Sequence, residues 1–249
     1  MNYIIEIATA DYNTTKSAVE GGADRIELCA DLAQGGTTPS YATIKKCRED
    51  FNVDLFPIIR PRGGDFFYSD KEYEIMAEEV KLCKHLGCNG IVIGLLNTDG
   101  TIDINRTTRL IELAYPMEVT FHRAFDRCKD AFEALEQLIQ IGCQRILTSG
   151  QKLTAPEGTD LIAQLVKAAD ERIIIMPGSG VRKENIKVLA DKTGAIEFHS
   201  SLRGRQRGAM EFIHPAFTNS EESYSQPAIE PEEVKALRNA LLNHEKSTA

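Results

Sequence analysis

The sequence lacks a long apolar segment, and its start lacks the features of a secretory signal. No stretch approaches the roughly 18 apolar residues that a membrane-spanning helix needs. The opening residues, MNYIIEIATADYNTT, hold no basic cluster before their short apolar run, so they indicate a first strand rather than a signal peptide. These absences predict a cytoplasmic protein that makes no use of a membrane.

Paired cysteine motifs and an excess of positive charge are also missing. The six cysteines form no CxxC pair, which argues against the usual zinc and redox motifs, and a disulfide framework is not expected in a reducing cytoplasm. Lys and Arg number 29 against 37 Asp and Glu, a net charge of -8. Since a general nucleic-acid-binding protein needs a basic face, we expect none here, although a local basic cluster could bind one phosphate.

What the chain does contain is eight short apolar runs, each separated from the next by room for one helix. They cover residues 3–8, 25–29, 55–60, 90–94, 118–121, 145–148, 172–176 and 195–199. The phrases GGADRIEL, LGCNGIVI and IGCQRILT repeat one pattern, a glycine that ends a helix, a short turn and a strand. Alternating strands and helices give a closed barrel or a doubly wound sheet. The count of eight and the absence of an early GxGxxG favour a single-domain (β/α)8 TIM barrel.

Helix signals lie between these runs, and the repeat stops near residue 200. Helical periodicity is clearest over 71–86, 105–114 and 131–141, and Thr38-Pro39 and Ser69-Asp70 are predicted helix starts. The barrel is expected over about residues 3–200 of one domain spanning 1–249, followed by a long connection, 201–230, and a closing helix over about 231–246. The connection could be a mobile lid, an extra anion contact or a disordered segment.

Ionisable residues follow the predicted strands. The fifth strand is followed at once by a base, a cation and an acid, in His122, Arg123 and Asp126. Sites in such barrels lie at the carboxyl ends of the strands. Strand alternation places a set of polar residues inside, near this mouth: Glu6, Glu27, Cys29, Arg60, Thr120, His122, Glu197 and His199. Glu6, Glu27, His122 and His199 are therefore candidate acid–base groups, and the alternative is a buried ion-pair network that fixes the strand register.

Three loops suit an anion. Two arginines flank a proline in the loop after strand three, and small residues end strands six and seven, where backbone N–H groups can face a phosphate. The candidate anion-binding residues are Arg60, Arg62, Arg123, Ser149, Gly150, Gly178, Ser179 and Gly180. The alternatives are a salt-bridged surface loop and simple tight turns. The neighbouring Phe66, Phe67 and Tyr68 are interpreted as exposed aromatics that suit a ligand lid or a subunit contact.

Six motifs together resemble the copper homeostasis protein CutC family over roughly residues 3–205. They are GADRIELC (22–29), GGTTPS (35–40), IRPRGGDFFYS (59–69), FHRAFD (121–126), ILTSG (146–150) and MPGSGV (176–181). The resemblance implies a cytoplasmic, oligomeric TIM barrel that handles copper and binds copper(I). It makes Cys29 the candidate metal ligand, with His122 or Met176 assisting.

Two functions are open at this point. The resemblance implies copper homeostasis through a bound copper ion. The residues themselves favour an enzyme, of the lyase or isomerase type, that acts on a small anionic or phosphorylated metabolite at the mouth of the barrel. In either case we expect a small molecule or a metal ion as ligand, a homodimer or higher homo-oligomer, and neither nucleic acid nor membrane as partner.

Overall fold

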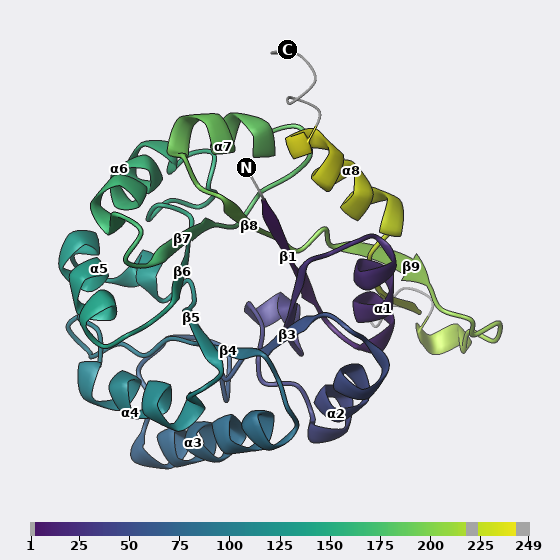
Figure 1. The fold of residues 1–249 in the computed structure, drawn as a ribbon. Coiled ribbons are helices and arrows are strands. Elements are labelled where there is room, and N and C mark those ends of the chain that lie inside the picture. Colours follow the sequence, from purple (N-terminus) through teal and green to yellow (C-terminus); the bar gives the residue numbers. More distant parts are fainter. Residues whose placement is uncertain (1–2, 218–223, 243–249) are drawn as a thin grey trace.

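The computed structural model describes residues 3–217 and 224–242, and its centre is a ring of parallel strands with helices outside (Figure 1). The ring strands are β1 (Ile4–Thr9), β2 (Arg25–Leu28), β3 (Asp54–Pro57), β4 (Gly90–Ile93), β5 (Glu118–Phe121), β6 (Arg145–Thr148), β7 (Ile174–Pro177) and β8 (Glu197–Ser200). The helices are α1 (Tyr12–Glu20), α2 (Tyr41–Asp50), α3 (Asp70–His85), α4 (Ile104–Ala114), α5 (Ala131–Gln140), α6 (Thr159–Ala169), α7 (Ile186–Thr193) and α8 (Pro231–Leu242).

The strand order closes the ring. One ladder runs β3-β2-β1-β8 and the other β4-β5-β6-β7, so the first strand pairs with the last. Between β3 and β4, the Ile59 amide donates to the Val92 carbonyl at 2.8 Å. The predicted (β/α)8 barrel is therefore confirmed, and the doubly wound alternative is wrong. All eight predicted strands are present, with ends that differ from the prediction by up to three residues.

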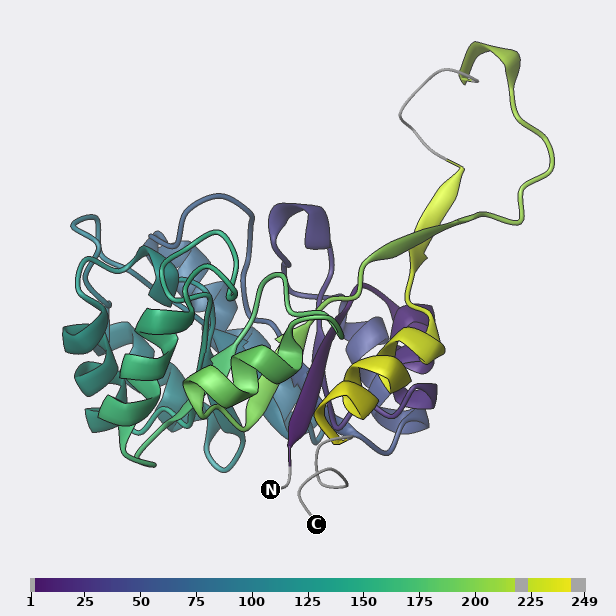
Figure 2. The same ribbon diagram turned by 90° about the horizontal axis from the view of Figure 1, so that it is seen from above.

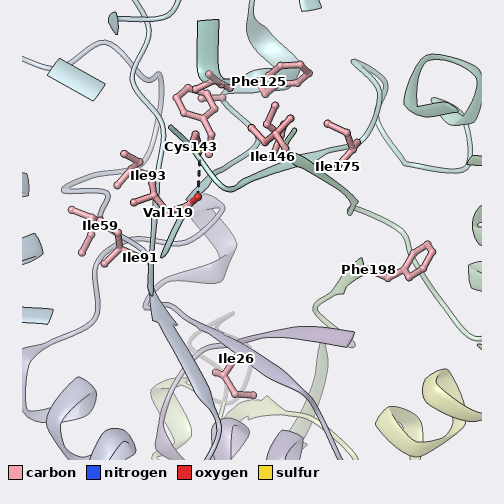
Figure 3. Close-up of a cluster of buried hydrophobic side chains, with 14 of the residues drawn as sticks. Ile26, Ile59, Ile91, Ile93, Val119, Phe125, Cys143, Ile146, Ile175 and Phe198 are labelled. Carbon is pink, nitrogen blue, oxygen red and sulfur yellow. Dashed lines mark hydrogen bonds between the residues drawn. The ribbon is translucent and has the colours of Figure 1, made fainter. Parts of the chain in front are cut away.

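The two faces of the strands have different chemistry. Outward side chains pack under the helices in the main apolar core, where Ile26, Ile91, Val119 and Phe198 lie fully buried (Figure 3). The inward face carries most of the buried charge instead. The pleat fixes this division, since alternate residues of a strand point to opposite faces.

Helix starts follow local capping chemistry. Ser69 caps α3 by accepting from the Glu72 amide, and the Glu72 carboxylate accepts a hydrogen bond from the Ser69 amide, so the predicted start is confirmed. The predicted start at Thr38-Pro39 is wrong, because Ser40 is the N-cap of α2 and both residues precede it. No helix among the described residues is long and apolar enough to cross a membrane.

The chain after β8 leaves the barrel and returns to complete the helix ring. β9 (Gly204–Arg207) and β10 (Ser225–Ala228) form an antiparallel ribbon that projects from the mouth side of the barrel (Figure 2). α8 then lies between α7 and α1 (Figure 1), where Arg238 pairs with Asp24. Residues 218–223 of the predicted connection and 243–246 of the predicted closing helix lie outside the described residues.

Candidate functional site

The end of the barrel opposite the mouth, where the strands begin, holds a buried ion-pair network; this end is called the inner end below. Glu197 accepts hydrogen bonds at 2.6 Å from both Arg25 and Arg145, and both guanidiniums lie over the ring of Phe56. Arg145 is 2% exposed. Glu197 faces inward as expected, but it pairs with arginines at the starts of β2 and β6 rather than with a ligand. For this residue the alternative of a structural network is correct.

Above this network, three side chains form an acid–base chain. His199 Nδ1 lies 2.8 Å from Glu6 Oε1, and His199 Nε2 lies 3.7 Å from Glu27 Oε2. Burial alone would raise the pKa of Glu6, but the hydrogen bond to His199 and nearby positive charges lower it. Burial raises the pKa of Glu27, whereas the pKa of His199 is raised by both carboxylates against the effect of burial. An ionised Glu6 therefore holds a His199 that faces Glu27, the carboxyl with the raised pKa.

His122 differs from His199, because its surroundings favour the neutral imidazole. Its Nδ1 accepts a hydrogen bond from the Ala124 amide at 3.0 Å, so the proton of the neutral ring lies on Nε2. Burial, with the charge of Arg60, lowers the pKa of His122 to about 3. Phe66 packs on the ring at 4.9 Å, and a Cβ on Gly94 would come within 2.3 Å of it. His122 is thus held as a neutral donor, and its predicted acid–base role stays a prediction.

These groups surround a cavity of about 1100 Å³ at the mouth. Of the predicted site residues, seven line it: Glu27, Arg60, His122, Arg123, Ser179, Gly180 and His199. Glu6 lies beneath His199 and is fully buried. Cys29, Arg62, Ser149, Gly150 and Gly178 do not line it.

The two arginines of the RPRGG loop have different roles. Arg60 lines the cavity, but its terminal nitrogens donate to the carbonyls of Gln34, Gly36 and Gly64, so it mainly holds two mouth loops in place. Arg62 lies outside the cavity and pairs with Glu72 at 2.6 Å. The salt-bridged surface loop, one of the alternatives from the sequence, describes Arg62.

The loop after β6 already contains an anion of the protein itself. The Asp126 carboxylate accepts hydrogen bonds from the amides of Ser149 and Gln151 and from the Thr148 and Ser149 hydroxyls. The Gly150 amide donates to the Thr148 hydroxyl. Asp126 therefore occupies the anion position that the sequence assigned to a ligand, and it ties the end of β5 to the end of β6.

The loop after β7 remains open to a ligand. Gly178 donates to the Thr148 carbonyl at 2.9 Å. The next three amides, of Ser179, Gly180 and Val181, donate no hydrogen bond within residues 3–217 and 224–242. Ser179 is held in a left-handed conformation, φ 74°, because its hydroxyl donates to the Leu153 carbonyl and its own carbonyl accepts from the Ala155 amide. Such amides at a barrel mouth suit a phosphate.

Cys29 lies in an apolar environment. It is 1% exposed and packs with Phe56, Ile58 and Val92 in a small cluster on the inner face. Burial, with the nearby Glu27, raises the pKa of its thiol well above the usual value. In the described part of the chain, no three His, Cys, Asp or Glu side chains are placed to hold a metal ion. Since copper(I) prefers thiolate, this donor set fits copper poorly.

Several arginines of the cavity and of the ion-pair network were not singled out from the sequence. Arg127, Arg182 and Arg203 line the cavity, and Arg25 and Arg145 form the inner network. The last two stand at matching places in the repeated phrases GGADRIEL and IGCQRILT, which was the available signal. The aromatic prediction was partly wrong: Phe67 is 49% exposed and Phe66 faces the cavity, but Tyr68 is buried at 2% exposure.

Comparison with known proteins identifies the family. The family model described as the CutC family matches residues 3–204. The chain belongs to the CutC family. Curated CutC proteins from Chromobacterium violaceum and Parabacteroides distasonis are 46% and 52% identical to this chain, over 97% and 85% of it and 99% and 88% of their own lengths. The crystal structure of a CutC protein from Streptococcus agalactiae superposes with a TM-score of 0.76 at 32% identity, covering 80% of this chain and 98% of that one.

Proposed function

We propose that this CutC-family protein is an enzyme that binds a small anionic metabolite at the barrel mouth and moves a proton on it. The observation that carries this proposal is the charge at the mouth. Among the described residues that line the cavity are five arginines, Arg60, Arg123, Arg127, Arg182 and Arg203, against two carboxylates, Glu27 and Asp65. In a chain of net charge -8, such a local excess favours an anionic ligand.

The acid–base chain supports the reaction class. Glu27 lines the cavity and has a raised pKa, and His199, with its own pKa raised, lies 3.7 Å away. A carboxyl whose pKa is raised, beside an imidazole whose pKa is also raised, can accept and return one proton. Lyase and isomerase reactions need this transfer and no redox partner.

The proposal is tested by incubating the full chain with a bacterial metabolite extract in D₂O. We expect mass spectrometry and NMR to show one compound that is consumed or gains deuterium, with Glu27→Gln inactive. Glu136→Gln is the matched charge control, because Glu136 pairs with Arg172 on the surface and is outside the cavity. No change in any compound, or equal changes with Glu27→Gln, would overturn the proposal.

A role in copper homeostasis is the second candidate, and the family supports it. The protein from Streptococcus agalactiae is named as a copper homeostasis protein. For this chain the proposed ligand is Cys29, and the proposed source is a cytoplasmic copper(I) pool. Native mass spectrometry under reducing conditions should then show one copper(I) per chain, lost in Cys29→Ser and kept in Cys47→Ser. The same spectra report the proposed homo-oligomer, and the absence of stoichiometric copper would remove this candidate.

A further inference from the structure

His122 is the part of the cavity that the acid–base chain leaves unexplained. Its residue exposure is 4%, it lines the cavity, and its Nε2 has no hydrogen-bond partner among the described residues. A buried donor without a partner is costly, and in a residue that lines the cavity an acceptor that enters the cavity, a water molecule or a ligand, relieves this cost.

The surroundings of His122 fix both the proton and the direction of this donor. The Ala124 amide occupies Nδ1, so Nε2 carries the hydrogen. The ring lies against Phe66, which in turn lies 5.0 Å below the Arg60 guanidinium. Gly94 leaves the space that the ring occupies. These contacts fix the ring of a cavity-lining residue with its hydrogen on Nε2, and such a donor stabilises negative charge that develops on an oxygen within its reach.

The loop after β7 brings a second set of hydrogen-bond donors to the same cavity, two backbone amides and one guanidinium. The amides of Ser179 and Gly180 are unbonded within the described residues. Within residues 3–217 and 224–242, Arg182 donates hydrogen bonds through Nη1, to the Val181 carbonyl and the Ser200 hydroxyl, and none through Nη2. Unbonded amides beside a guanidinium match the oxygens of a phosphate monoester.

We propose that the ligand is a phosphorylated carbonyl compound that the site converts to its enolate. The Ser179–Gly180 amides and Arg182 hold the phosphate, and His122 Nε2–H donates to the carbonyl oxygen. This inference rests on the proposed function and names the substrate class for it.

The step is a proton transfer at the carbon beside the carbonyl. The C–H bond breaks and its proton passes to the Glu27 carboxylate. The C–H electron pair becomes a C=C bond, the C=O π pair moves to the oxygen, and the resulting oxyanion accepts the His122 hydrogen bond. His199 faces Glu27 and stabilises its carboxylate before transfer. Where the deprotonated carbon carries a hydroxyl, its O–H proton moves to the oxyanion, the first carbon becomes the carbonyl, and return of the proton from Glu27 to the former carbonyl carbon gives an isomer. Where the next carbon carries a leaving group, the C=C pair forms a new double bond as that group departs with its bonding electrons, and a lyase product results.

The test uses 2-phosphoglycolate, whose carboxylate resembles an enediolate, with inorganic phosphate and glycolate as partial probes. Isothermal titration calorimetry on the full chain should show 2-phosphoglycolate binding at least about tenfold tighter than phosphate, since it adds a charge-assisted hydrogen bond. His122→Leu should lose about 10- to 100-fold in affinity for 2-phosphoglycolate and keep its affinity for phosphate. His122→Gln, which retains an N–H near the Nε2 position, should lose less.

The outcomes separate this inference from the function on which it rests. If phosphate binds but 2-phosphoglycolate binds no tighter, or if His122→Leu binds both as the wild type does, the enolate assignment is wrong and the anion-binding pocket stands. If neither probe binds the folded wild-type protein, and no metabolite is converted, both proposals fail. Unchanged phosphate affinity in His122→Leu shows that the variant is folded.

Discussion

Glu6 and His199, 193 residues apart in the chain, meet at 2.8 Å where the first strand pairs with the last. The ring closure of the barrel therefore brings this acid–base pair together. Because Glu6 is fully buried and ionised, it raises the pKa of His199 and orients the ring toward Glu27.

This pairing predicts a pH-dependent loss of stability in Glu6→Gln. Since the pKa of folded His199 is raised, its pairing stabilises the protein fully below the unfolded value, about 6.5, and the contribution disappears as pH rises through the folded value. Urea unfolding should therefore show Glu6→Gln destabilised by about 1.5–3 kcal/mol at pH 6 and by less at pH 9. NMR titration should show a lower pKa for His199 in the variant. An equal loss at both pH values would contradict the pairing.

The inner network predicts a large cost for breaking one buried ion pair. Arg145→Met removes one of the two arginines that pair with Glu197 and leaves Arg25 as the other. The variant should lower the free energy of unfolding by about 3–5 kcal/mol. Arg172→Met is the matched control, because Arg172 and Glu136 are both more than 40% exposed, and it should cost less than about 1 kcal/mol. Similar losses in the two variants would show that the network contributes little.

Gly94→Ala should displace His122. The added Cβ would lie 2.3 Å from the imidazole and 2.9 Å from the Ala124 side chain. We expect a destabilisation of about 1–3 kcal/mol, the usual cost of overpacking, and weaker binding of 2-phosphoglycolate. The double variant Gly94→Ala/His122→Ala should show a favourable coupling energy, because one clash is removed. Strict additivity would mean that the two positions do not meet.

All six cysteines should resist modification in the native protein. Each is free and buried, and burial raises the pKa of Cys47, Cys128 and Cys143 to about 11. The hydrogen bond with Cys83 lowers the pKa of Cys88, so for that thiol burial alone limits the reaction. A thiol-disulfide dye at pH 8 should react slowly with the native chain and release six equivalents after unfolding in denaturant. Rapid reaction of one thiol, mapped by mass spectrometry to Cys29, would instead support an accessible metal ligand.

The sequence predicts which face a side chain occupies better than how deep it lies. The pleat correctly places Glu197 and His199 on the inner face, because they are two residues apart. Their depth depends on the stagger between strands, which sets Glu6 opposite both Arg25 and His199. That stagger has no local signature, so Glu197 was expected at the mouth although it pairs with Arg145 at the inner end.

Hydrogen-bond partners supplied by other loops were also not predictable. Ser149 and Gly150 have the composition of an anion loop, but Asp126 fills it from the end of the preceding strand. Conversely, Arg182 was not singled out, because its place in the cavity depends on how the β7 loop packs on Ser200. Composition indicates the chemistry of a loop, whereas tertiary contacts decide whether a ligand or the protein satisfies it.

The ribbon of β9 and β10 leaves the barrel and returns to it at one point, since Gly204 pairs with Ala228. In the described part of the chain, these two adjacent strands lead from β8 out along the ribbon and back to α8. We therefore expect β8 and α8 to keep their places when residues are inserted into the described part of the ribbon. A reporter inserted beyond Arg207 would leave the mouth residues on their own strands, making this ribbon the natural attachment point for labels that follow ligand binding.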